Sequence, residues 1–218
     1  MLNNENALPR NGMSLYTSGM TYRAIGFDYD GVITRHERTT FNEEIAQLLG
    51  VSVEQYRYAY FRHNHLWNIQ GVALADGYAI VLRELGKQHM LPQVIDLIAS
   101  QPVATVRPDM IELVQQLRSR GYQVGLLSNA SCADGVQIRL RVGSVFDTVL
   151  ISSDIGCQKP SREAFEKLAH ALHVSLTELI FVDDTPRSLD SAGELGFTPI
   201  LFTSTEQLVT TLKRYRVL

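Results

Sequence analysis

The sequence predicts an α/β fold, a Rossmann-like parallel sheet core whose first strand is separated from the others by a helical insert. Three observations predict it. A short apolar run stops at "GFDYDG", residues 26–31, as a strand does where it meets a glycine turn. Residues 40–100 carry only helical periodicity, and strand-like and helix-like stretches alternate beyond Pro102.

The chain of 218 residues is long enough for one sizeable domain with a smaller insert. We expect a sheet core formed by residues 22–36 and 102–218 and a helical cap formed by residues 37–101. About sixty residues is more than an ordinary connection between strands needs, so the insert is expected to act as a lid or substrate domain. Residues 1–21 are polar, lack the pattern of a secretory signal, and are expected to form a flexible tail.

The expected cap helices follow from apolar residues spaced three and four apart. Two such stripes are Phe41, Ile45, Leu48 and Leu49, and Tyr78, Val81, Leu82 and Leu85. Capping signals mark the ends of these helices. The signals are Thr40 with Glu43, Ser52 with Gln55, and the terminating glycines Gly50 and Gly86.

The core elements follow in the alternation expected of a parallel sheet. One helix carries Met110, Leu113, Val114 and Leu117 and ends at Gly121, and another carries Phe165, Leu168, Ala169 and Leu172. Further strands are expected at "YQVGLLSN", "TVLIS", "ELIFVDD" and "TPILF". Helices are also expected from Pro186 and over residues 205–215.

Composition excludes several classes of protein. The formal net charge of -3 lacks the basic excess of a general nucleic-acid binder. The longest apolar runs, such as "YAIVL", fall far short of the roughly 20 residues that span a bilayer, so no membrane segment is expected. Cys132 and Cys157 are the two cysteines, too few for a disulfide framework. They suit a reducing cytosol, and we expect a cytoplasmic protein in which both are inert, buried thiols.

Polar side chains follow the predicted strands where the strands end. They are Asp28 and Asp30, Ser128 and Asn129, and Asp183 and Asp184, with Lys159 in the nearby loop "GCQKPS". Ligands of open α/β sheets bind beyond the carboxyl ends of the strands, so we expect these side chains to gather there. Four converging carboxylates repel one another and require a cation or raised pKa values. Because the available ligands are oxygens, Mg²⁺ is favoured over zinc.

The stretches "DYDGVIT", "LLSN", "QKPS" and "FVDD", in this order and with a helical block after the first, resemble the four motifs of the haloacid dehalogenase-like hydrolase superfamily. The resemblance extends from Arg23 to the C-terminus. A single pair of aspartates would be weak evidence, but four ordered motifs are specific. The resemblance implies that superfamily's fold with a small helical cap, and a Mg²⁺-dependent phosphatase that acts on a small phosphorylated metabolite.

The resemblance also implies a role for each residue of the first motif. Asp28 is the implied nucleophile, which forms an aspartyl-phosphate, and Asp30 is the implied acid and base that also contacts the phosphate. Gly31 is expected to let the backbone turn close to the substrate. Tyr29 replaces the usual aliphatic residue or Phe and is expected to affect packing more than chemistry. The dehalogenases of the family lack an acid at the position of Asp30, so its presence favours phosphoryl transfer.

The other motifs are implied to bind phosphate and metal. Ser128, Asn129 and Lys159 are the implied contacts of the phosphoryl oxygens, and Lys159 would also offset charge on the nucleophile. The implied metal ligands are the carboxylates of Asp28 and Asp184, the carbonyl oxygen of Asp30, and Asp183, either through water or as an orienting partner.

Structural interpretations compete with each of these roles. Asp and Gly are ordinary turn residues, Ser128 and Asn129 suit a helix cap, and Asp183 and Asp184 suit the start of the helix at Pro186. The order of the four motifs favours catalysis. In the cap, Tyr56, Tyr60, His63, His65 and Trp67 either line a pocket or pack, and helical spacing favours packing. The two histidines point in different directions on a helix, so no metal pair is expected there.

Rival functions share part of this pattern. A phosphomutase uses the same site but returns the phosphoryl group to a sugar, and the sequence does not separate it from a phosphatase. A receiver domain also combines acids, a hydroxyl and a lysine, but it is shorter and has no helical insert. A non-catalytic binding protein for a phosphorylated ligand is disfavoured by the complete set of acids. Substrate identity and oligomeric state are not encoded in recognisable patterns.

Overall fold

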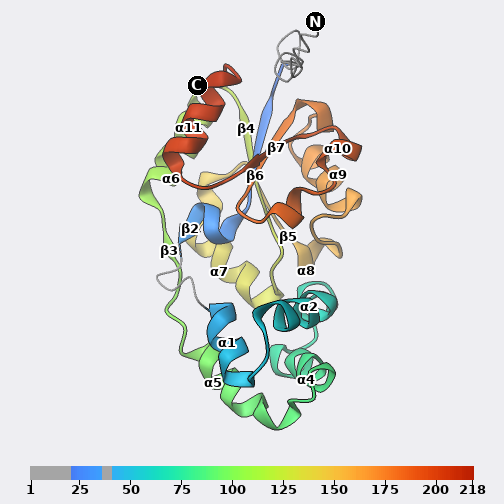
Figure 1. Ribbon diagram of the computed structural model, residues 1–218. Helices are drawn as coiled ribbons and strands as arrows, with labels where there is room; N and C mark the ends of the chain where they lie inside the picture. Colours follow the sequence, from blue (N-terminus) through green and yellow to red (C-terminus); the bar gives the residue numbers. More distant parts are fainter. Residues whose placement is uncertain (1–20, 36–40) are drawn as a thin grey trace, which may run out of the picture.

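The computed structural model describes residues 21–35 and 41–218. The chain forms a sheet core and, at one end of it, a block of helices (Figure 1). This arrangement confirms the predicted α/β fold class with a parallel sheet. The expected flexible tail lies outside the described residues, apart from Thr21. Thr40, the residue expected to cap the first helix of the insert together with Glu43, also lies outside them.

Five parallel strands form the core sheet in the order β5-β4-β1-β6-β7. The strands are β1 (Ala24–Phe27), β4 (Gln123–Ser128), β5 (Thr148–Ile151), β6 (Leu179–Asp183) and β7 (Thr198–Leu201). β1 lies at the centre, and Phe27 is in register with Leu126 of β4 and Val182 of β6. The strands therefore end at nearly the same level, and the residues that follow them meet at one edge.

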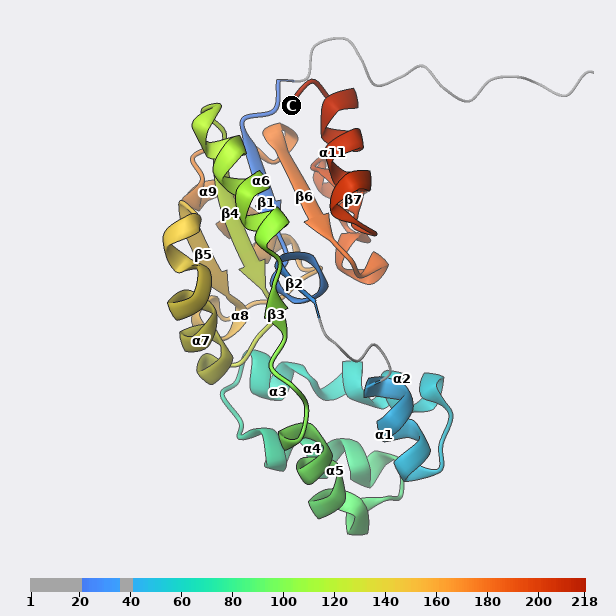
Figure 2. The ribbon, with the colours of Figure 1, turned by 90° about the vertical axis from the view of Figure 1, so that its left-hand side faces the viewer.

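Helices cover both faces of the sheet (Figure 2). The apolar cluster on one face includes residues of α6 (Pro108–Ser119), α7 (Cys132–Val142) and α11 (Thr205–Arg214). The cluster on the other face includes residues of α9 (Arg162–Ala171) and α10 (Ala192–Leu195). The short elements of the core are η1 (Tyr29–Ile33), η3 (Gly143–Val145), α8 (Ser152–Ile155), η4 (Leu176–Glu178) and η5 (Pro186–Leu189).

Three helices differ from the sequence expectation. α7 and the short α8 have no predicted counterpart: in α7, Gly135 interrupts the apolar pattern of the sequence, and the Val136 and Leu140 side chains are exposed instead of completing a stripe. The helix expected from Pro186 is only a short 3₁₀ turn, and α10 follows it. The other predicted core strands and helices are present within one to a few residues of their expected ends.

The helical block contains α1 (Phe41–Leu49), α2 (Val53–His63), α3 (His65–Asn68), α4 (Leu74–Glu84), η2 (Gln88–Met90) and α5 (Leu91–Ala99). Its centre is an aromatic cluster of its own. The Trp67 ring stacks on Tyr78 with centroids 5.4 Å apart, and the hydroxyls of Tyr56 and Tyr78 lie 3.1 Å apart. Packing is thus the role of Tyr56 and Trp67, both of which are buried. The capping box of Ser52 with Gln55 is also present.

Two short linkers join the block to the core. β2 (Thr34–Arg35) leads out and β3 (Thr105–Val106) leads back, and they pair antiparallel with Thr34 opposite Val106. In Figure 2, the chain runs from α5 through β3 to α6 along the side of the molecule. In the part of the chain that the structure describes, no helix has the length and apolar character needed to cross a membrane.

We expect Gly26→Ala to lower the free energy of unfolding by about 1–3 kcal/mol, because the interior is already full at this position. A Cβ on Gly26 would lie 2.6 Å from Phe181 Cδ2 and 2.8 Å from Leu168 Cδ2, and both side chains are fully buried. The matched control is Gly193→Ala, where a Cβ meets nothing within 4 Å. Urea unfolding should show a loss in the first variant and none in the second, and equal stability of the two would contradict this packing.

Candidate active site

The chain leaves β1 through a tight turn that fixes Asp28. Its backbone N–H donates to the Val182 carbonyl oxygen over 2.9 Å, which continues the pairing with β6 by one residue. Its carboxylate accepts a hydrogen bond of 2.7 Å from the backbone N–H of Tyr29. Asp28 is thereby held at the end of the central strand, at the start of the turn Tyr29–Ile33.

Gly31 is required within this turn for two reasons. Its φ of +80° lies in the left-handed region that side chains rarely adopt. A Cβ there would also lie 2.0 Å from Asp184 Oδ2, so any other residue would displace that carboxylate. The group that closely approaches Gly31 in the structure is thus the carboxylate of the fourth motif, and the predicted approach of the Gly31 backbone to the substrate stays a prediction.

Lys159 lies buried between two carboxylates. Its Nζ is 2.8 Å from Asp28 Oδ1 and 2.5 Å from Asp183 Oδ2, and its side chain is 2% exposed. The ammonium also lies 5.1 Å from the centroid of the Phe181 ring. Asp183 is fully buried and accepts a second hydrogen bond, 2.9 Å long, from the backbone N–H of Thr185. The three charged groups thus connect the ends of β1 and β6 with the loop that carries Lys159.

The pKa values reflect burial and crowding of negative charge. Burial raises the pKa of Asp28, and the Asp183 and Asp30 carboxylates add to the shift, while Lys159 opposes it. Burial alone would lower the pKa of Lys159, but the attraction of Asp28 and Asp183 outweighs it and raises that pKa. The pKa of Asp184 is raised by burial and by Asp183. The site favours bound positive charge.

Asp28, Asp183 and Asp184 fit a divalent cation. Each offers a carboxylate oxygen, and these oxygens lie within 4.8 Å of one another. Three carboxylates with one ammonium leave an excess of negative charge, and an all-oxygen set suits a hard ion such as Mg²⁺. Asp30 is exposed, and its Oδ1 accepts a hydrogen bond of 3.2 Å from the Thr34 hydroxyl. Its carbonyl oxygen stays a predicted ligand.

Asn129 holds the loop that carries Lys159. Its carboxamide donates to the Lys159 carbonyl oxygen over 3.0 Å and accepts from the Lys159 N–H over 2.8 Å. The phosphate contacts predicted for Asn129 and for the buried Ser128 stay predictions. The alternative role as a helix cap falls to a different residue, because the N-cap of α7 is Ser131, whose hydroxyl accepts from the Asp134 N–H.

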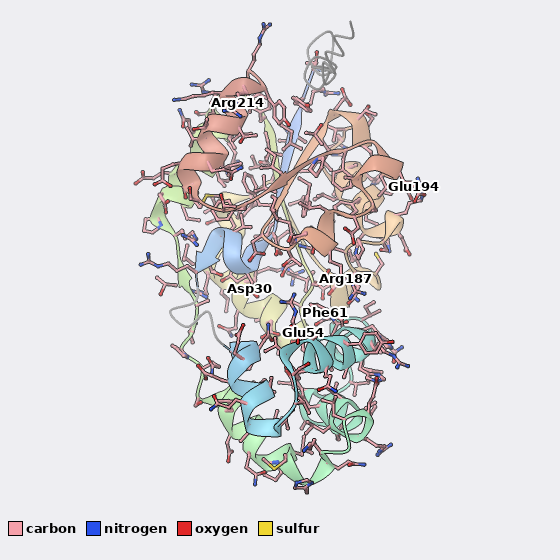
Figure 3. The ribbon with its side chains drawn as sticks, viewed as in Figure 1. Asp30, Glu54, Phe61, Arg187, Glu194 and Arg214 are labelled. Atoms are coloured by element: carbon pink, nitrogen blue, oxygen red, sulfur yellow. The ribbon has the colours of Figure 1, made fainter. Side chains whose placement is uncertain are left out.

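The helical block meets the core beside this site (Figure 3). The Arg187 guanidinium, from the turn after β6, lies 5.0 Å from the centroid of the Phe61 ring in α2. One turn further along, Asn64 Oδ1 accepts a hydrogen bond of 3.4 Å from Gln158, the neighbour of Lys159 in the loop. The C-terminal half of α2 therefore faces two of the loops that carry the predicted site residues.

Sequence reasoning does not find these contacts between block and core. The Ser152 hydroxyl donates to the Asn68 carbonyl oxygen over 2.8 Å and accepts from the Ala130 N–H over 2.9 Å. Ser152, Asn64 between α2 and α3, and Asn68 of α3 are buried. The sequence offers one signal for these contacts: Asn64 and Asn68 lie four residues apart in an aromatic helical stretch. This spacing indicates a polar contact with the core only when both asparagines are known to be buried.

Two further polar residues of α2, Tyr60 and His63, have different surroundings. Burial raises the pKa of Tyr60, and its neighbours Tyr78 and Asp30 add to the shift. His63 contacts Glu84, with Nε2 2.6 Å from Oε2.

Comparisons with known proteins identify the family and the fold. The model of the haloacid dehalogenase-like hydrolase family matches residues 22–196. A phosphatase of Mycobacterium tuberculosis is 27% identical over 195 residues, which cover 84% of this chain and 88% of that protein. Among solved structures, a HAD-like hydrolase of Porphyromonas gingivalis has a TM-score of 0.66 at 21% identity and covers 91% of this chain and 98% of its own. A HAD family enzyme of Bacteroides thetaiotaomicron in complex with magnesium and inorganic phosphate has a TM-score of 0.59 at 18% identity, with coverage of 84% and 94%.

We expect Lys159→Met to lower the free energy of unfolding by about 3–5 kcal/mol, because it leaves the buried Asp183 carboxylate without its partner. Adding Asp183→Asn to this variant should restore part of the loss. Urea unfolding in the presence of chelator measures both effects without a bound cation. Lys213→Met, at an exposed lysine of α11, is the control and should change stability by less than about 1 kcal/mol. Wild-type stability of Lys159→Met would contradict the buried ion pairs.

Proposed function

The chain belongs to the haloacid dehalogenase-like hydrolase family, and on that basis we propose that it is a Mg²⁺-dependent phosphatase of a small phosphorylated metabolite. The observation that carries the proposal is the buried Lys159 between Asp28 and Asp183, beside Asp184. This arrangement combines a nucleophilic carboxylate, a fixed cation and an oxygen-rich metal site at one edge of the sheet. The similarity to a mycobacterial phosphatase supports the same reaction class.

Covalent catalysis divides the reaction into two steps. A carboxylate oxygen of Asp28 attacks phosphorus and the bond from phosphorus to the leaving oxygen breaks, while Asp30 gives its proton to that oxygen. Asp30 then takes a proton from water, which attacks the aspartyl-phosphate, releases inorganic phosphate and restores the Asp28 carboxylate. The Thr34 hydroxyl, 3.2 Å from Asp30 Oδ1, orients the acid and base.

Charge neutralisation is the second part of the proposal. Lys159 offsets the negative charge that Asp28 and the phosphoryl group share, and Ser128 is the proposed hydroxyl contact of the phosphoryl oxygens. When bound, Mg²⁺ would be held by Asp28 and Asp184, with Asp183 as an indirect or orienting partner, and would neutralise the transferred group. The magnesium and phosphate complex of the Bacteroides enzyme supports this cofactor.

Asp30 favours hydrolysis of a phosphate ester over hydrolysis at carbon. Displacement of a halide needs no acid, because the leaving ion is stable without a proton. An alkoxide that leaves phosphorus does need one. A cytoplasmic location belongs to the same proposal and is supported by the free thiols of Cys132 and Cys157. Cys157 is buried as expected from the sequence, but the expectation of burial is wrong for Cys132, which is exposed.

We expect the protein to release inorganic phosphate from some member of a panel of phosphorylated metabolites, with Mg²⁺ and not with chelator. Asp28→Asn should abolish the release while circular dichroism and the melting temperature stay close to wild type. Asp96→Asn, at an exposed acid of α5, is the control and should retain full activity. Conversion of a sugar phosphate to its isomer without phosphate release would identify a mutase, and wild-type rates in Asp28→Asn would refute the nucleophile.

We expect Asp30→Asn to slow the reaction by about 10²–10⁴-fold, because the variant loses proton transfer to the leaving oxygen. The loss should be much smaller for p-nitrophenyl phosphate, whose leaving group departs without a proton, than for an alkyl phosphate. Mg²⁺ affinity, measured by calorimetry, should change little. An equal loss for both substrates would remove the acid role from Asp30.

A further inference from the structure

Tyr29 lies between the two proposed catalytic aspartates but takes no part in the proposed chemistry. Its ring is 4% exposed and packs in the main apolar cluster of the core, as the sequence analysis expects. Its hydroxyl, however, is not left to solvent. It accepts a hydrogen bond of 2.9 Å from Nη1 of Arg141, a residue of α7 that is 112 positions further along the chain. A phenylalanine would fill the same space without this bond.

The same guanidinium also binds the linker that returns from the helical block. Nη2 of Arg141 donates to the carbonyl oxygen of Ala104 over 2.5 Å. Ala104 immediately precedes β3, and its side chain and backbone are nearly buried. Arginine presents its donors in a fixed planar fork, so the two acceptors are held at a set separation and direction. The Arg141 side chain thus joins the turn Tyr29–Ile33, which follows the proposed nucleophile and is called the nucleophile turn below, to the linker that returns from the helical block.

The other end of the same turn is joined to the same linker. The backbone N–H of Arg107 donates to the Ile33 carbonyl oxygen over 2.9 Å, and its Nε donates to the Thr34 carbonyl oxygen over 3.2 Å. The turn Tyr29–Ile33 is therefore attached to the linker at both of its ends, at the far end through Arg107 and at the near end through Arg141. A shift of the linker displaces the residues on either side of Asp30.

We propose that Arg141 and the Tyr29 hydroxyl form a clasp that couples the position of the helical block to the position of the nucleophile turn. Arg141 acts on catalysis through Tyr29 and is a positioning residue. In this scheme Asp28 and Asp30 are held in their reactive arrangement only when Ala104 of the returning linker lies where Arg141 can bind it and the Tyr29 hydroxyl at the same time. The kinetic part of this inference rests on the proposed phosphatase function, whereas the structural coupling does not.

The first test measures the coupling without substrate. Tyr29→Phe removes only the hydroxyl, and Arg141→Met removes both donors while keeping a long apolar stem. Amide hydrogen exchange, followed by mass spectrometry, should accelerate by roughly tenfold in peptides that cover residues 29–34 and 103–107, since a hydrogen bond to a charged group is lost. Exchange elsewhere in the core should match wild type.

Arg139→Met is the matched control for this test. Arg139 lies on the same helix and pairs with Asp154 on the exposed side, so its loss should leave both peptides unchanged. Unchanged exchange of residues 103–107 in Tyr29→Phe would overturn the clasp. So would an acceleration spread evenly over the whole core, because that would show a general loss of stability.

The second test asks whether the pair acts as a unit in turnover. Tyr29→Phe and Arg141→Met should each lower kcat by roughly tenfold, about 1.4 kcal/mol in the barrier, with little change in KM. The double variant should be no slower than the slower single variant, because both remove the same contact. Arg141→Lys, which can reach one acceptor but lacks the fork, should recover part of kcat.

These outcomes separate the clasp from the proposed function. Additive losses in the double variant, or wild-type kcat in both single variants, would overturn the coupling while phosphatase activity remained established. If the wild-type protein released no phosphate from any substrate, the proposed function would fail, and the exchange measurements would still decide whether the clasp exists.

Discussion

The buried ammonium of Lys159 is the interaction on which the site depends. Asp28 follows β1 and Asp183 ends the adjacent parallel strand β6, and their carboxylates would repel each other if nothing lay between them. Lysine at this point lets the two acids lie side by side, and the reciprocal hydrogen bonds with Asn129 fix the backbone from which it reaches them. Its single positive charge does not balance these two carboxylates, and Asp184 adds a third, so the site retains negative charge that a divalent cation would neutralise.

The register of the sheet brings these charged residues together at one edge. Because Phe27 is level with Val182, the residue after each strand lies at the same edge, and the carboxylate of Asp184 approaches the turn so closely that position 31 must be glycine. The central strand carries Asp28, the proposed nucleophile, at its end, where neighbouring strands on both sides limit its movement. Catalytic groups on strand ends are held more rigidly than groups on free loops, which suits a reaction that depends on the placement of charge.

The part of this arrangement that could be predicted from sequence is the part encoded locally. Apolar runs that stop at acids predict the strand ends, and the alternation of strands and helices predicts a parallel sheet at whose edge those acids gather. α7 could not be predicted, since Val136 and Leu140 are exposed and its periodicity is broken. The contacts of Arg141 with Tyr29 and of Arg187 with Phe61 join residues that are far apart in sequence, and no local pattern specifies which arginine finds which partner.

The helical block is apolar inside, but hydrogen bonds and a cation–π contact join it to the core. Among the described residues, the apolar cluster of the block is separate from the two clusters of the sheet core. Contacts that join the block to the core include two hydrogen bonds, Gln158 with Asn64 and the Ser152 hydroxyl with the Asn68 carbonyl, and the Arg187 guanidinium over the Phe61 ring. Each such contact contributes about 0.5–1.5 kcal/mol, far less than the burial of a large apolar cluster. The block therefore has an apolar core of its own and is joined to the sheet core by contacts that are individually weak, which suits the lid role predicted for it from the sequence.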